Sequence, residues 1–304
     1  MSHFTVMVIG ANIEEQLAPY DENIRVDKYY QGEVPEKDKQ DMLKYYQEKE
    51  KLTFKDFDDC YGQKGKEWNG GCWEKDEDGV WKEYSTYNPK SKWDWWCIGG
   101  RWSGSLITHL KPEAKDVISE ENFGESGLFN NEVGIDSIEK KYIDFDAIRK
   151  EKEDNARERY RKIASLFENN EIPRIEYTFN GLREKYPDMS AEERREMYGS
   201  QPGVQVWEDA LNKDKNKKEE RIIDFYTDIE DYQCTEDEFA KSAGDNSFVT
   251  YALVKDGEWY QRGRMGWFGI SSDEMEGDKW SEFVRKTLEE TDDDELITIV
   301  DCHI

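Results

Sequence analysis

The residues best suited to chemistry gather in one segment, 88–104, which reads NPKSKWDWWCIGGRWSG. Its Gly99-Gly100-Arg101 run could offer backbone N–H groups and a guanidinium to a phosphate. Arg262 and Arg264 stand in a second loop with glycines and aromatic residues, and they could join the same anion site. The chain lacks the glycine fingerprints of nucleotide-binding loops, however. The alternative is a structural contact in which an arginine stacks on tryptophan and holds two loops together.

Tryptophan is concentrated in the same segment, which holds four of the chain's 11 tryptophans. Aromatic rings bury a large area, and glycine lets a backbone approach a neighbouring surface closely. The cluster therefore indicates either the core of a loop-rich region or a binding surface, and the sequence leaves both open. The residues concerned are Trp93, Trp95, Trp96 and Trp102.

Asp94 is the acidic residue with the most aromatic neighbours, because it stands between these tryptophans. Burial among indole rings would suit a carboxyl group to general acid catalysis. A turn cap, or an ion pair with Lys92 or Arg101, accounts for the same position and is the interpretation we favour. His109 lies in a strand-like run, and no G-x-S-x-G motif is present. We therefore predict no catalytic residue.

A metal site would need His3, Cys302 and His303, which come close only if the two ends of the chain pair as strands. Cys60 and Cys72 could add ligands. Zinc sites usually show closely spaced ligand pairs such as CxxC or HxxxH, and this chain has neither. Neighbouring residues in a strand point to opposite faces, so Cys302 and His303 cannot easily share one ion. We expect neither a metal nor another cofactor.

Short apolar runs at both extremes of the chain, residues 4–9 and 296–300, predict two buried strands of one sheet. The Lys255-Asp256-Gly257 segment predicts a hairpin turn between two further strands. Apolar residues at helical spacing predict helices over 143–167 and 279–288. The strand-forming ends and the helical middle therefore belong to different parts of the fold.

These elements predict an α+β fold in which the terminal segments form one mixed domain with a small sheet. Residues 1–140 would supply its N-terminal part, including the tryptophan- and glycine-rich loops. Residues 241–304 would supply the hairpin, a helix and the final strand. Residues 141–240 would form a charged insertion, helical and extended, that interrupts this domain. Within the first part we expect a loop over 11–35 and irregular structure with short strands over 56–105.

The chain is strongly acidic, with 70 Asp and Glu against 43 Lys and Arg in 304 residues and a net charge of -27. Such a charge repels nucleic acid and anionic membranes at long range and favours basic partners, including clefts that normally hold DNA. Solubility alone is the alternative explanation. Aromatic residues make up 13%, which argues against disorder.

The start of the chain lacks the basic segment of a signal peptide, and no apolar run approaches the roughly 20 residues that span a bilayer. The five cysteines are odd in number and lack CxxC spacing. We therefore expect free thiols in a reduced cytosolic setting and no membrane contact.

Three segments together resemble a family of phage-encoded proteins. They are MSHFTVMVIG with QLAPYDEN at the start, NPKSKWDWWCIGGRWSG, and RGRMGWFG with ITIVDCHI at the end. Size, acidity and layout are also similar to those of phage inhibitors of the bacterial Gabija defence system. This second resemblance implies a homo-oligomer without enzymatic activity, in the host cytoplasm, that wraps a defence nuclease complex and blocks its DNA binding and cleavage.

On this hypothesis the partner is a host complex with a basic DNA-binding surface, and nucleic acid itself is not bound. The contact surface would lie in the insertion, with Tyr160, Arg161, Phe167 and Tyr177 as candidate contacts. One alternative is an anti-defence protein that binds or degrades a nucleotide, with Arg101, Arg262 and Arg264 on the phosphate. Another is a component of the phage particle.

Overall fold

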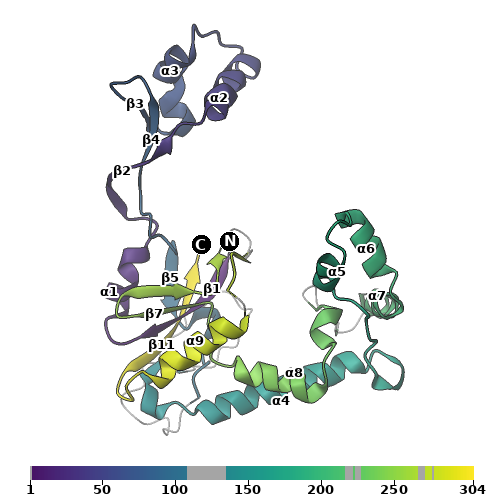
Figure 1. Cartoon of the computed structure of the whole chain (residues 1–304). Coiled ribbons are helices and arrows are strands. Elements are labelled where there is room, and N and C mark those ends of the chain that lie inside the picture. The colour runs from purple at the N-terminus through teal and green to yellow at the C-terminus, as the bar shows by residue number, and fades with distance from the viewer. Residues whose placement is uncertain (1, 108–134, 216–221, 223–226, 266–270, 276) are drawn as a thin grey trace.

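A mixed β-sheet built from both ends of the chain forms the central domain (Figure 1). The computed structural model describes residues 2–107, 135–215, 222, 227–265, 271–275 and 277–304. In these residues the strand order is β5-β11-β1-β7-β8, and β6 also pairs with β11. The strands are β1 (His3–Ile9), β5 (Trp95–Ile98), β6 (Ser137–Glu139), β7 (Ala252–Lys255), β8 (Glu258–Gln261) and β11 (Leu296–His303).

The two terminal strands are the middle of this sheet. β1 and β11 pair antiparallel, so that His3 lies opposite His303 and Ile9 lies opposite Ile297. β7 pairs parallel to β1 on its other side. The predicted pairing of the chain ends and the α+β class are therefore confirmed, although β11 continues to His303, three residues beyond the predicted strand.

Each face of the sheet has its own core. One face packs against α9 (Gly277–Glu289), whose Trp280 and Val284 are buried beside Met7 and Ile299. The other face packs against α1 (Ile13–Leu17), a 3₁₀ turn (Ala18–Tyr20) and the buried ring of Trp93. Since side chains alternate along a strand, β1 contributes to both cores.

The hairpin between β7 and β8 forms where the sequence predicts it. Asp256 and Gly257 adopt φ of 55° and 76°, which matches the two positive φ angles that a tight type I′ turn requires. The predicted helix over 279–288 is α9, and the predicted helix over 143–167 is α4 (Phe145–Ala164).

A separate lobe, here called the distal lobe, is formed by residues 25–87 and stands away from the central sheet (Figure 1). Its own core contains Met42, Tyr46, Cys60 and Trp73. Its elements are β2 (Arg25–Glu33), α2 (Glu36–Glu48), α3 (Phe57–Asn69), β3 (Trp73–Lys75) and β4 (Trp81–Tyr87), with β4 as the middle strand.

The sequence predictions were wrong in parts of this lobe. The expected loop over 11–35 contains β2, and the expected irregular region contains the 13-residue helix α3. Gly62 and Gly65 lower the helical propensity of α3, so its pattern is weak. Its ends are well capped, because Asp56 accepts a hydrogen bond from the Asp59 N–H and Gly70 takes a left-handed conformation.

A helical arm runs out from the central domain along α4 and returns along α8 (Glu236–Asp245) (Figure 1). It corresponds to the predicted charged insertion. A third core at its far end contains Ile163, Phe167, Trp207 and Tyr232. The helices there are α5 (Phe179–Lys185), α6 (Ala191–Gly199) and α7 (Pro202–Lys215). The division of the chain at 140 and 240 stays a prediction.

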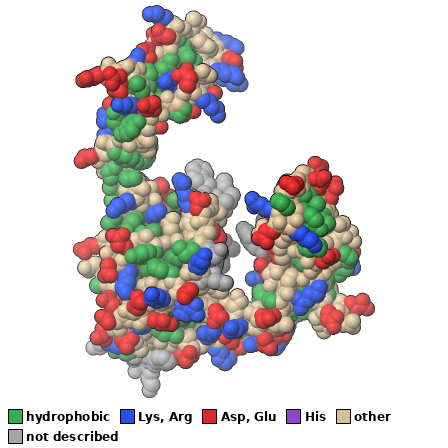
Figure 2. All heavy atoms as spheres, in the orientation of Figure 1, with side chains coloured by type: hydrophobic (Ala, Val, Ile, Leu, Met, Phe, Trp, Pro, Cys, Tyr) green, Lys and Arg blue, Asp and Glu red, His purple; other side chains and the backbone are tan. Residues whose placement is uncertain are grey.

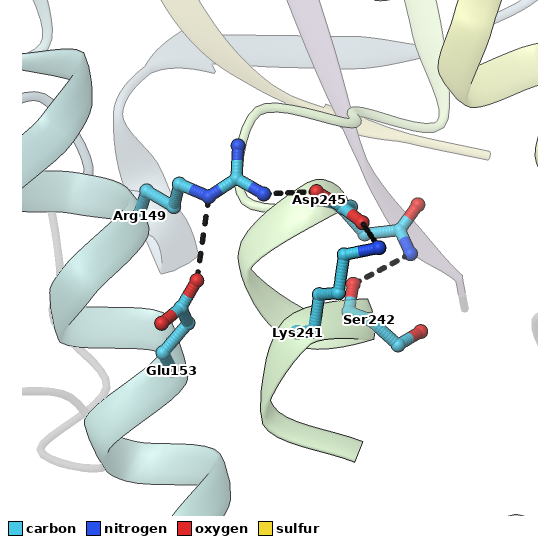
Figure 3. A network of polar contacts seen from close by, with 6 residues as sticks. Arg149, Glu153, Lys241, Ser242 and Asp245 are labelled. Atoms are coloured by element: carbon cyan, nitrogen blue, oxygen red, sulfur yellow. Dashed lines mark hydrogen bonds and ion pairs between the residues drawn. The ribbon is translucent and has the colours of Figure 1, made fainter. Parts of the chain in front are cut away.

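An ion pair joins α4 to α8 near the base of the arm (Figure 3). Arg149 on α4 reaches Glu153 on its own helix, with 3.3 Å from Nε to Oε1, and also pairs with Asp245 on α8. A Cβ atom on Gly244 would lie 2.6 Å from Glu153 Oε1, so glycine permits the close approach of the helices. No described helix is long and apolar enough to cross a membrane. The remaining short strands are β9 (Arg264–Met265) and β10 (Ser271–Ser272).

Met42→Ala should loosen the distal lobe and leave the central sheet intact. Met42 is fully buried in the core of that lobe, and truncating a buried methionine costs about 2–5 kcal/mol. Hydrogen exchange followed by mass spectrometry should accelerate within residues 25–87. The matched variant Leu253→Ala should accelerate exchange in the sheet instead. Acceleration through the whole chain in Met42→Ala would show that the lobe does not fold independently.

Candidate functional site

Two histidines stand side by side at one end of the central sheet. His3 begins β1 and His303 ends β11, and the register places them directly opposite each other. Opposed residues of an antiparallel pair project from the same face. Their ring centroids are 4.9 Å apart and the ring planes meet at 71°. The side chains keep 18% and 13% of their surface exposed, so both imidazoles reach solvent.

Each imidazole is held by an aspartate through the same ring atom. His3 Nδ1 lies 2.8 Å from Asp301 Oδ1, and His303 Nδ1 lies 2.6 Å from Asp94 Oδ1. A carboxylate can only accept hydrogen bonds, so each Nδ1 donates. This fixes the ring orientation and leaves each Nε2 as the atom that can exchange a proton with a ligand.

The Gly99-Gly100-Arg101 run holds Asp301 in place. The Arg101 N–H donates to Asp301 Oδ2 over 3.0 Å. Gly100 has φ of +53°, and a Cβ atom there would lie 2.4 Å from Asp301 Cβ. Both the conformation and the space therefore require glycine at this position.

The neighbouring glycine leaves room for a second carboxylate, that of Asp136. A Cβ atom on Gly99 would lie 2.4 Å from Asp136 Oδ2, and Asp136 accepts hydrogen bonds from the Ser103 hydroxyl and the Gly104 N–H. The Gly99 N–H is taken by Ile299 O, 2.8 Å away. The loop that the sequence suggests for an external phosphate thus binds two carboxylates of the protein itself.

Asp94 is fixed by the loop between α1 and the distal lobe. Its N–H donates to the main-chain oxygen of His303, and its own carbonyl accepts from Asn23 Nδ2. The strand register places Trp95, the next residue, opposite His303. The carboxylate of Asp94 is therefore paired with the His303 imidazole, where the sequence led us to expect an ion pair with Lys92 or Arg101.

The four tryptophans of the segment divide between core and surface. Trp93 is buried and donates through Nε1 to Leu17 O over 3.3 Å. Trp96 packs against the same core, and Trp102 packs against the core on the other face. Trp95 is 47% exposed and lies edge-on to His3, with ring centroids 6.3 Å apart. Of the two interpretations of the cluster, core packing holds for three rings and surface exposure for the fourth.

A cavity of about 270 Å³ lies on the histidine-bearing face of the sheet. Thr5 lines it and stands opposite Asp301, two residues along β1 from His3. Trp102 and Ile299 form apolar parts of its wall, and Lys152 from α4 contributes a cation. The volume lies just below the range of common small-molecule sites.

The remaining predicted anion-site residues lie apart from the histidines. Arg262 forms an ion pair with Glu274, with 3.1 Å between Nη2 and Oε2. Arg264 is exposed in β9 and lines a different pocket with Phe4, which projects from the opposite face to His3. The structure therefore does not bring either arginine into one site with Arg101.

Some of the candidate partner contacts are buried or hydrogen bonded within the arm itself. Tyr160 donates its hydroxyl to Cys234 O, and Phe167 is buried in a stack on Trp207. Arg161 lies at the surface in an ion pair with Glu236, and half-buried Tyr177 pairs with Lys185. Phe167 thus packs within the core of the arm, and the role of these four residues as partner contacts stays a prediction.

Sequence reasoning missed Asp301 as a positioning residue. The available signal was one acidic residue inside an otherwise apolar terminal strand, between buried Val300 and Cys302. Within the described parts of the chain, no group of three His, Cys, Asp or Glu side chains is placed to hold a metal ion. The arrangement is thus a pair of oriented imidazoles. His109 lies outside the described residues.

Comparison with known proteins finds no matching family model, no matching curated protein and no matching solved structure.

Gly100→Ala should destabilise the central domain by about 1–3 kcal/mol, because it adds a clash with Asp301 at a left-handed position. Gly62→Ala is the matched control, since it lies in α3 with open space around it and should be neutral or stabilising by up to about 1 kcal/mol. Urea unfolding followed by hydrogen exchange in β1 and β11 measures both. Equal stability of the two variants would contradict the role assigned to Gly100.

Proposed function

We propose that this chain is an acid–base enzyme that cleaves or transfers a phosphate ester of a nucleotide. The observation that carries the proposal is the pair of adjacent imidazoles, each oriented through Nδ1 by an aspartate. Histidine is the side chain that exchanges protons between about pH 5 and 8. Two such groups at one site can remove one proton and supply another in the same reaction.

The chemistry follows from the two free Nε2 atoms. One neutral imidazole takes the proton from an attacking water or hydroxyl, whose oxygen then forms a bond to phosphorus. The bond from phosphorus to the leaving oxygen breaks, and the other imidazole, in its protonated form, donates a proton to that oxygen. Protons and charge balance over the step without a further reactant. Asp301 and Asp94 stabilise whichever ring is cationic.

Neighbouring residues support a nucleotide as the substrate class. The exposed indole of Trp95 lies beside His3 and offers a face for stacking a base. Arg101 is exposed in the same segment, and its main-chain N–H donates to Asp301, so this loop contributes a hydrogen-bond donor next to the histidines. The cavity beside Thr5 provides space for part of the ligand.

His3→Gln and His303→Gln should each lower turnover about 10²–10⁴-fold, because each removes one proton-transfer group. The assay is a panel of nucleoside triphosphates and of linear and cyclic dinucleotides. For a substrate that is turned over, kcat/KM should be bell-shaped in pH, and each variant should lose one limb. Turnover unchanged in either variant would refute the proposal, as would the absence of turnover across the panel.

Asp301→Asn should lower kcat with little change in KM, since Asp301 acts through His3 and does not contact substrate. Asp58→Asn is the matched control, because Asp58 is also hydrogen bonded but lies in the distal lobe. If both variants lose activity equally, the effect of Asp301 is not local to the site.

A second candidate is an acidic protein that binds a basic host defence complex and blocks its DNA binding. Two observations favour it: the net charge of -27, and the two units that project from the central domain, each with its own core (Figure 1). Acidic side chains are spread over all three parts of the face in Figure 2, among lysines and arginines. The resemblance to phage-encoded proteins points the same way, with host cytoplasm and a homo-oligomer as its setting.

Co-elution with a purified Gabija complex, together with loss of its DNA cleavage, tests this second candidate. Inhibition should weaken as salt rises, because electrostatic attraction between exposed charges is screened. His3→Gln should inhibit as well as the natural sequence if binding is the activity. Full cleavage at saturating protein, without co-elution, would exclude the complex as the partner.

A further inference from the structure

Lys92 and Arg264 form a pair of neighbouring cations on the face of the sheet opposite the two histidines. Both line a cavity of about 190 Å³ whose walls include the rings of Phe4, Tyr251 and Trp259. Lys92 is half-buried, and burial together with the charge of Arg264 lowers the pKa of its ammonium group. Like charges on one cavity repel each other, and an anion bound between them would relieve that repulsion.

No described acidic side chain neutralises the pair. The other side chains that line the cavity are uncharged, and the side chains of Lys92 and Arg264 have no hydrogen bond or ion pair within the described chain. Arg262, two residues before Arg264, shows the usual alternative, since it pairs with Glu274. Within the described residues, two neighbouring cations without an acidic partner are unexpected in a chain of net charge -27.

We propose that Lys92 and Arg264 bind a phosphate group in this pocket, either as free phosphate or as the phosphate of a small aromatic ligand. The guanidinium offers a planar fork of donors and the ammonium a point charge, a combination that suits phosphate oxygens. Ser91 and Gln261 also line the cavity and add hydroxyl and amide groups. The volume accommodates a phosphate but is small for a whole nucleotide, so an aromatic ring on the ligand would contact lining rings such as Trp259 and Tyr251.

This pocket is separate from the histidine site. Phe4 and Ile304 line it, whereas their neighbours His3 and His303 project from the other face, because successive side chains in a strand alternate. The inference therefore does not depend on the proposed enzymatic activity, and it is tested by binding and not by turnover.

Calorimetric titration of the full chain with inorganic phosphate, AMP and adenosine at low ionic strength tests the proposal. Phosphate or AMP should bind and adenosine should not, and tighter binding of AMP than of phosphate would identify the source as an aromatic ligand. Lys92→Gln and Arg264→Gln should each weaken binding at least about tenfold, because each removes one charge-assisted contact. The matched control Arg262→Gln should bind like the natural sequence.

Two further measurements make the result specific. The double variant His3→Gln/His303→Gln should keep the affinity for phosphate, which assigns the binding to this pocket and not to the histidine site. Circular dichroism of Lys92→Gln and Arg264→Gln should match that of the natural sequence, so that lost binding reports the site itself. The proposal would be overturned if the natural sequence bound neither phosphate nor AMP, or if both cation variants bound them with the affinity of the natural sequence.

Discussion

The antiparallel pairing of β1 with β11 is the interaction on which the rest of the structure depends. It joins the first and last segments of the chain and places them in the middle of the sheet. Residues of these two strands enter both cores of the central domain. The distal lobe and the helical arm lie between these strands in the sequence. Both are attached to a sheet whose middle pair forms only when the two chain ends come together. The pairing also creates the candidate site, since His3 and His303 become neighbours through this register alone.

The tryptophan- and glycine-rich segment acts as a support for that pair. Gly100 permits the close approach of Asp301, which orients His3, and Asp94 in the same segment orients His303. A ring held by a carboxylate on one nitrogen presents the other nitrogen in a defined direction, which free surface histidines do not. The segment thus links core packing to the orientation of both imidazoles. Three of its tryptophans contribute to core packing, whereas Gly100 and Asp94 serve the orientation of the imidazoles.

Several elements were predictable because their signals are local. The apolar runs of β1 and β11, the Asp256-Gly257 turn and the amphipathic pattern of α9 each depend on a few adjacent residues. Helix α3 was not predictable in the same way, because its glycines weaken the pattern and its stability comes from aromatic packing within the distal lobe. Asp301 was missed for a related reason, since nothing near it in sequence shows that it faces His3 and the N–H of Arg101.

Composition and local apolar runs were enough to predict the acidic charge, the α+β class and the two terminal strands that pair, because these signals lie within short segments. The task of the tryptophan- and glycine-rich segment emerged only from the folded chain. Contacts between residues some two or three hundred positions apart, such as Arg101 with Asp301 and His3 with Asp301, depend on the strand register and on which face each side chain takes. A shift of β11 by one residue against both β1 and β5 would move each histidine relative to its aspartate. That geometry is set by the packing of the whole sheet, so no local pattern could have revealed it.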